Sequence, residues 1–143
     1  MSKLYELKNI IGVKDATGDL KRVELQKKTM GNEFIQLTGN DENALEFNKL
    51  GGVGAIGVTA NIAAKLSSEF QKACVEDKEK AFELDKILQP LHAAMFVESN
   101  PSPVKYAASL LKMCDANVRL PLVEVQEVNK KKISEALKDA KIL

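Results

Sequence analysis

Short apolar runs alternate with helical patterns over the first half of the chain. The runs are rich in β-branched and aromatic residues and end near glycine or polar turn residues, which predicts strands at residues 10–14, 34–38 and 55–59. Apolar residues at helical spacing predict helices over residues 19–30, 40–50 and 61–76. Because single helices connect these strands, the three strands are expected to run parallel.

The pattern becomes wholly helical after residue 76. An apolar stripe covers residues 77–97, and Pro90 inside it is expected to kink or break that helix. Farther along, Ser102 is predicted to cap a helix whose first residue is Pro103. A last amphipathic helix is expected from Asn129 onward. The pattern therefore predicts an α/β fold in which parallel strands are followed by helices alone.

Composition and charge exclude several classes of function. The 143 residues include 21 Lys and Arg against 20 Asp and Glu, and no basic face with stacking aromatics indicates nucleic-acid binding. No apolar run reaches the length of a membrane span, and the amino terminus lacks the apolar core of a signal peptide. Cys74 and Cys114 are isolated and His92 is the only histidine, so we expect reduced thiols, no metal site and a cytoplasmic location.

One strand delivers a single lysine to a turn. The predicted strand is apolar up to Lys14, which is followed directly by the turn residues 15–18. A parallel α/β barrel presents an amine to a substrate in this way. A lysine at the end of a strand is also commonly a solvent-exposed terminator, so the pattern alone leaves both interpretations open. Asp15 falls on the opposite face and is expected to point outward rather than to act as an acid or base.

Five segments, in order along the chain, resemble the dihydrodipicolinate synthase / N-acetylneuraminate lyase family. They are residues 9–20 (NIIGVKDATGDL), 38–41 (TGND), 50–61 (LGGVGAIGVTAN), 96–105 (FVESNPSPVK) and 119–121 (RLP). The fourth segment resembles the synthases of the family rather than its sialic acid lyases. The resemblance extends from about residue 4 to residue 143.

This resemblance implies the C-terminal part of a TIM (β/α)8 barrel, followed by a C-terminal helical extension. Residues 1–76 would hold barrel strands six to eight, and residues 77–143 would form a helical region that packs on them. Residues 4–8 resemble the end of the helix before strand six. The family's tyrosine proton relay, Gly-Thr-Thr carboxylate clamp and substrate-binding arginine have no counterpart here. We therefore expect a truncated or split family member that is inactive as this chain alone.

The resemblance also assigns roles to individual residues. Lys14 matches the lysine that forms an imine with pyruvate, and Ile56 matches the residue whose main chain contacts bound pyruvate. Gly39 and Asn40 fall near the aldehyde pocket, although Asn40 stands where an acidic residue is common. Gly57 replaces a frequent serine, which we expect to matter little. The implied reaction condenses pyruvate with aspartate semialdehyde in lysine biosynthesis, with no cofactor and no metal.

Residues 52–57 also spell the pattern GxGxxG. A dinucleotide-binding loop must follow a strand and open a helix. This run instead follows a predicted helix and enters a predicted strand. We therefore assign these glycines to a helix-to-strand turn.

Three interpretations of the whole chain stay open. In the first, it is an enzyme portion that complements a separate N-terminal half. In the second, it is a remnant without activity. In the third, it is an interaction module that self-associates as a homo-oligomer or docks on a full-length relative. Another pyruvate-dependent aldolase is disfavoured by the segment at residues 100–105.

Overall fold

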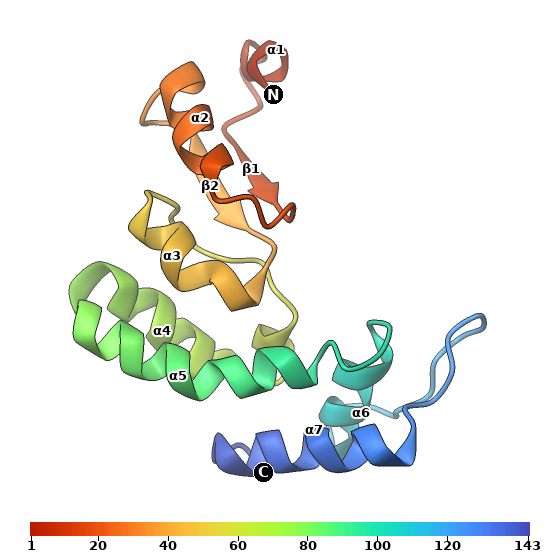
Figure 1. Ribbon diagram of the computed structural model, residues 1–143. Coiled ribbons are helices and arrows are strands. Elements are labelled where there is room, and N and C mark those ends of the chain that lie inside the picture. Colours follow the sequence, from red (N-terminus) through yellow and green to blue (C-terminus); the bar gives the residue numbers. More distant parts are fainter. The chain divides into compact units, whose positions relative to one another are not determined.

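The computed structural model describes residues 1–143, which form two compact units, Met1–Gly57 and Val58–Leu143. The first unit, drawn in red to yellow in Figure 1, combines a short sheet with helices. Its elements are α1 (Ser2–Tyr5), β1 (Gly12–Asp15), α2 (Lys21–Met30), β2 (Ile35–Thr38), the 3-10 helix η1 (Asp41–Asn43) and α3 (Ala44–Lys49). The predicted alternation of strands and helices is confirmed through α3.

The sheet of the first unit is parallel, as predicted. Strands β1 and β2 pair from Gly12 opposite Ile35 to Asp15 opposite Thr38. Helix α2 is the crossover between them, and the sheet is joined to it by a buried hydrogen bond from Gln36 Nε2 to the Val23 carbonyl, 3.1 Å long. This connection is the one that a parallel pair requires.

The prediction of a full third strand at residues 55–59 is wrong. A single parallel bridge joins Ala55 to Thr38, and the chain enters the 3-10 helix η2 (Thr59–Asn61) where the strand was expected to end. The backbone still follows β2, because Val53, Thr38 and Ile56 alternate as amide donors across the pair, to the carbonyls of Gln36, Gly54 and Thr38. The flanking glycines carry no side chain that could pack on a pleated surface, which weakens a strand at this point.

The core of the first unit lies where the helices meet the sheet. The buried apolar side chains are Val23, Met30, Phe34, Ala44, Leu45 and Phe47. The rings of Tyr5 and Phe34 meet edge to face, with centroids 5.0 Å apart, and this contact holds the first residues of the chain against the core.

The second unit is helical after η2. Its helices are α4 (Ala64–Glu76), α5 (Lys78–Ala94), α6 (Ser102–Leu110) and α7 (Glu127–Asp139). Helices α4 and α5 form an antiparallel pair, and α5 and α6 both pack against α7. The fully buried side chains of Leu88, Leu91, Met95, Ile133 and Leu137 form the centre of this unit. The apolar stripe predicted for residues 77–97 is therefore the core-facing side of α5.

Two helix details differ from the sequence-based expectation. Helix α5 continues through Pro90 without a break, because buried residues on both sides of the proline hold it in place. Ser102 is the first residue of α6 rather than its cap, and Pro103 is the second. The Ser102 hydroxyl instead donates a 2.9 Å hydrogen bond to the carbonyl of Val123, which ties the long loop after α6 to that helix.

The carboxylate of Glu98 holds the start of α7. Its Oε1 atom accepts hydrogen bonds from the Gln126 amide and from Asn129 Nδ2, both 2.9 Å long. These bonds lower the pKa of Glu98.

No helix of the chain combines the length and the apolar character that a membrane span requires.

The compact units divide the chain between Gly57 and Val58, so α4 belongs with α5 in the second unit. The predicted division between residues 76 and 77 follows the barrel resemblance instead of compactness. It stays a prediction.

Candidate active site

The four residues singled out by resemblance gather where three neighbouring segments end. Lys14 is the third residue of β1, and Gly39 and Asn40 directly follow β2. Ile56 lies beside them, because its amide donates a 2.8 Å hydrogen bond to the carbonyl of Thr38. The carboxyl ends of parallel strands are where barrel enzymes place their active sites.

Lys14 and Gly39 are in direct contact across the two strands. A Cβ atom placed on Gly39 would lie 2.8 Å from Lys14 Cε and 2.6 Å from the Ala16 methyl group. Both distances are too short for real carbon atoms. Glycine at position 39 therefore leaves the space through which the Lys14 side chain passes. The amine at the end of that side chain makes no hydrogen bond or ion pair within the chain and is open to a reactant.

Asp15 points away from Lys14, as predicted, and anchors α2. Its Oδ2 atom accepts a 2.6 Å hydrogen bond from Arg22 Nε and a 3.3 Å hydrogen bond from Gln26. Its Oδ1 atom accepts bonds from the amide and hydroxyl of Thr17, 2.9 and 2.6 Å long. Burial raises the pKa of Asp15, but the hydrogen bonds from Thr17 and Arg22, with the charge of the guanidinium, outweigh burial and lower it to about 2.

The turn after β2 is shaped by the hydroxyl of Thr38. This buried oxygen accepts a 3.0 Å hydrogen bond from the Asn40 amide and lies 3.2 Å from Asn43 Oδ1. Asn40 thus has a fixed backbone, and its side chain lies near Gly18 in the turn after β1. The amide of Asn40 carries no charge, so it can orient a polar group through hydrogen bonds but adds no negative charge to the site.

Ile56 offers its main chain to the same region. Its amide is used by Thr38, whereas its carbonyl accepts no hydrogen bond within the chain. The Ile56 side chain is 51% exposed. A free carbonyl beside an open amine can accept a hydrogen bond from a bound molecule or from a proton-carrying intermediate.

Sequence reasoning missed the part that Gly57 plays. A Cβ atom at this position would overlap the carboxylate of Asp41. Asp41 is a buried residue of η1, and its carboxylate occupies the space that a serine side chain at position 57 would need. The expectation that glycine here matters little is therefore wrong. The sequence gives no local signal of this contact, because Asp41 and Gly57 lie in different turns and meet only through space.

No group of three or more His, Cys, Asp or Glu side chains anywhere in the chain could hold a metal ion. The chemistry available at these strand ends is that of an amine, a free carbonyl and neutral polar groups. A primary amine of this kind forms imines with carbonyl compounds.

Comparisons with known proteins agree over almost the whole chain. The family model described as "Dihydrodipicolinate synthetase family" matches residues 1–140. The 4-hydroxy-tetrahydrodipicolinate synthase of Pelagibacter ubique (strain HTCC1062) is 64% identical over 147 residues, which is 100% of this chain and 50% of that protein.

Solved structures lead to the same group. The chloride-inhibited dihydrodipicolinate synthase of Acinetobacter baumannii, complexed with pyruvate, is 39% identical with a TM-score of 0.92, over 99% of this chain and 49% of that one. The dihydrodipicolinate synthase of Aquifex aeolicus is 35% identical with a TM-score of 0.94, over 99% of this chain and 49% of that one. The α/β fold described above is thus that of the TIM-barrel family, and the chain spans about half the length of the relatives it matches.

Proposed function

The chain belongs to the dihydrodipicolinate synthetase family, and on that premise we propose that it carries the imine-forming lysine of a pyruvate-dependent lyase. Lys14 is the nucleophile. The observation that carries the proposal is the open amine of Lys14, held against Gly39 at the carboxyl ends of the strands. The expected compartment is the cytoplasm, and the expected pathway is lysine biosynthesis.

The proposed chemistry begins with the lysine in its unprotonated form, since only that form is nucleophilic. The Lys14 nitrogen adds to the keto carbon of pyruvate, and the resulting carbinolamine loses water to give an imine. Loss of a proton from the pyruvate methyl group gives an enamine, whose carbon attacks the aldehyde carbon of aspartate semialdehyde. The Ile56 carbonyl faces the pyruvate unit, and Gly39 and Asn40 border the aldehyde.

The residues of this chain carry only part of that reaction. We propose that the carboxylate clamp, the proton relay and the arginine for the aldehyde substrate come from the half of the relatives' length that this chain does not match. Acid–base groups typically contribute factors of about 10² to 10⁴ in rate. The chain alone is accordingly expected to form the imine slowly and to show no measurable condensation.

The test is to trap the imine. The 143-residue chain is incubated with pyruvate, reduced with borohydride and analysed by intact mass and peptide mapping. A reduced pyruvate adduct on Lys14, lost in Lys14→Arg and retained in the control Lys21→Arg, is the expected result. Soluble wild-type chain that gives no adduct, while a full-length family member is labelled in parallel, would exclude independent imine formation.

A second candidate function is an interaction module formed by the sheet. Apolar side chains of the sheet and its flanks are exposed, at 64% for Ile11, 65% for Val53 and 51% for Ile56. Parallel strands are normally covered on both faces. Self-association through this surface would appear as a homo-oligomer in light scattering and would make no use of the Lys14 amine.

A further inference from the structure

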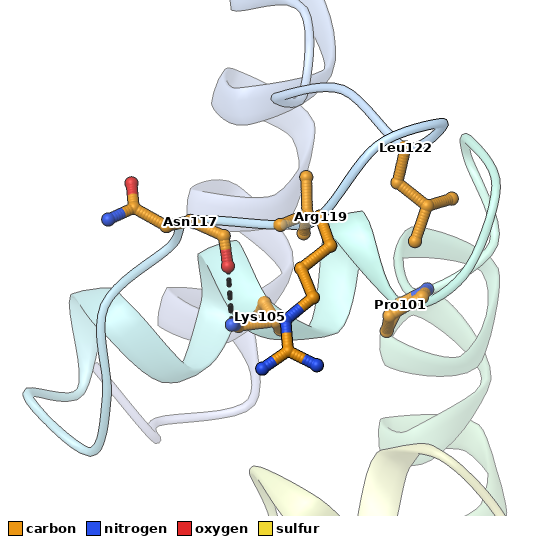
Figure 2. A pocket seen from close by; sticks show the side chains of 6 residues that line it. Pro101, Lys105, Asn117, Arg119 and Leu122 are labelled. Carbon is orange, nitrogen blue, oxygen red and sulfur yellow. Dashed lines mark hydrogen bonds between the residues drawn. The ribbon is translucent and has the colours of Figure 1, made fainter.

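The loop that follows α6 forms a pocket with two positive charges. It is an open cavity of about 500 Å³ lined by Pro101, Lys105, Asn117, Val118, Arg119 and Leu122. All six residues belong to the second unit. Figure 2 shows the Lys105 and Arg119 side chains extending to the same side of the loop, beside the apolar wall of Pro101 and Leu122.

The positive charge in this pocket has no counter-charge. No acidic side chain lines the cavity. Neither Lys105 nor Arg119 takes part in any of the ion pairs of the chain. The molecule as a whole has a formal charge of only +1, so two cations side by side are a local excess. Like charges repel one another, and an anion placed between them relieves that repulsion.

Most of the hydrogen-bond donors of Lys105 and Arg119 are also unused within the chain. The Lys105 ammonium donates one bond to the carbonyl of Asn117, which fixes the loop over α6 and leaves two donors free. The guanidinium of Arg119 makes no hydrogen bond within the chain, so its five donors remain available. This planar fork matches the two oxygens of a carboxylate.

The apolar lining of the pocket favours an anion with a hydrocarbon body over an inorganic ion. Pro101, Val118 and Leu122 provide apolar surface next to the two head groups. An inorganic ion would leave that surface in contact with water, whereas a short hydrocarbon body would cover it. We propose that this pocket binds a small organic carboxylic acid, with its carboxylate between Lys105 and Arg119 and its apolar body against Pro101, Val118 and Leu122. The inference uses none of the residues assigned to imine chemistry and does not rest on the proposed function.

Three probes separate head group, body and charge. Hexanoate, inorganic phosphate and hexylamine are titrated into the isotopically labelled 143-residue chain, and amide shifts are followed by NMR. Hexanoate is expected to bind at millimolar concentration and to shift the amides of Lys105, Val118 and Arg119. Phosphate is expected to bind more weakly, and hexylamine not at all. Equal binding of hexylamine or of phosphate would overturn the proposal, as would the absence of hexanoate binding.

Variants test the assigned cations. Because the Arg119 guanidinium makes no hydrogen bond or ion pair within the chain, Arg119→Gln is expected to keep the fold and to weaken hexanoate binding by about fivefold or more. The matched control Lys131→Gln removes the same charge from an exposed position on α7 and is expected to leave the affinity unchanged. Unchanged affinity in Arg119→Gln would overturn the assignment.

The association state of the chain in solution distinguishes a free small acid from a carboxylate supplied by a second copy of the chain. Sedimentation of the chain without added acid is expected to show the same association state for wild type and Arg119→Gln. A dimer that dissociates only in Arg119→Gln would mean that a carboxylate of a second copy fills the pocket, and the proposal of a small free acid would fail.

Discussion

The carboxylate of Asp15 is the residue-scale link between β1 and α2, and its ionisation is tied to folding. In the folded chain, the hydrogen bonds from Thr17 and Arg22 lower its pKa from the usual value of 3.8 to about 2. A carboxyl whose pKa is depressed on folding stabilises the fold above its unfolded pKa, and this contribution disappears as the pH falls through the folded pKa. The contribution of Asp15 is therefore complete at neutral pH and is lost between about pH 5 and pH 2.

Replacing this carboxylate gives a prediction with a defined pH dependence. Asp15→Asn is expected to lower the free energy of unfolding by about 2 kcal/mol at pH 7, with the difference from wild type shrinking towards zero near pH 2. Chemical denaturation followed by circular dichroism at several pH values measures it. The control Asp115→Asn changes the same charge in the loop after α6. A difference that does not depend on pH would show that the ion pair with Arg22 does not stabilise the fold.

Gly39 gives a second residue-scale prediction, because a methyl group there has two neighbours with different roles. Gly39→Ala brings a Cβ atom to 2.6 Å from Ala16 and 2.8 Å from Lys14 Cε, which is expected to cost about 1–3 kcal/mol of stability and to displace the lysine. The yield of trapped pyruvate adduct is expected to fall by about tenfold or more.

The double variant Gly39→Ala/Ala16→Gly separates stability from chemistry. It removes the clash with Ala16 and leaves the clash with Lys14. We expect thermal stability to recover and adduct formation to stay low. Recovery of both would mean that the space at Gly39 serves packing alone.

At the scale of the elements, α5 contains a proline that its neighbours tolerate. Pro90 is exposed and removes the amide that would otherwise bond to the carbonyl of Lys86. Pro90→Ala is expected to raise the free energy of unfolding by about 1–3 kcal/mol, since it restores that bond without losing buried contacts. Denaturant titration measures this change, with Glu83→Ala on the same helix as the control. A destabilised Pro90→Ala variant would show that the proline itself stabilises α5.

The same elements show how far sequence reasoning reaches. Helices α4, α5 and α7 follow from periodicity, because most of their buried residues are apolar and recur at helical spacing. Strands β1 and β2 follow instead from short β-branched runs between turn residues, although the residues that β2 buries are the polar Gln36 and Thr38. The strand predicted at residues 55–59 did not form in full, since its length depends on ladder partners that periodicity does not report. The continuity of α5 through Pro90 and the bond from Ser102 to Val123 likewise depend on packing across the fold.

The candidate site also combines features that local sequence patterns indicate with features that depend on contacts through space. Lys14 was singled out by the resemblance of residues 9–20 to the lysine strand of the family, because the apolar run that ends in one lysine left a catalytic amine and a surface terminator both open. The contact between Gly57 and Asp41 was not, because it joins two turns through space. The cation pair of Lys105 and Arg119 was not found either, since Lys105 lies on α6 and Arg119 in the aperiodic loop that follows it.

At the scale of the whole molecule, apolar side chains beside the sheet are left exposed by this chain. The exposed apolar side chains of Ile11, Val53 and Ile56 lie on or beside strands that barrels of this fold bury. A chain that spans about half of its relatives' length can cover this surface with the segment that those relatives have in addition. Burial of several apolar side chains, at roughly 25 cal/mol per Å², would hold the two parts together.

This argument predicts complementation. The chain is co-expressed with the unmatched half of the Pelagibacter ubique synthase, the relative that is 64% identical to it. We expect the two to co-purify and to condense pyruvate with aspartate semialdehyde at a rate at least about 10²-fold above that of either part alone. Lys14→Arg should abolish this activity while leaving the complex intact, because the substitution keeps the charge and the fold. A complex of wild-type parts without activity would contradict the catalytic role proposed for this chain, and self-association without binding of the second part would favour the interaction module.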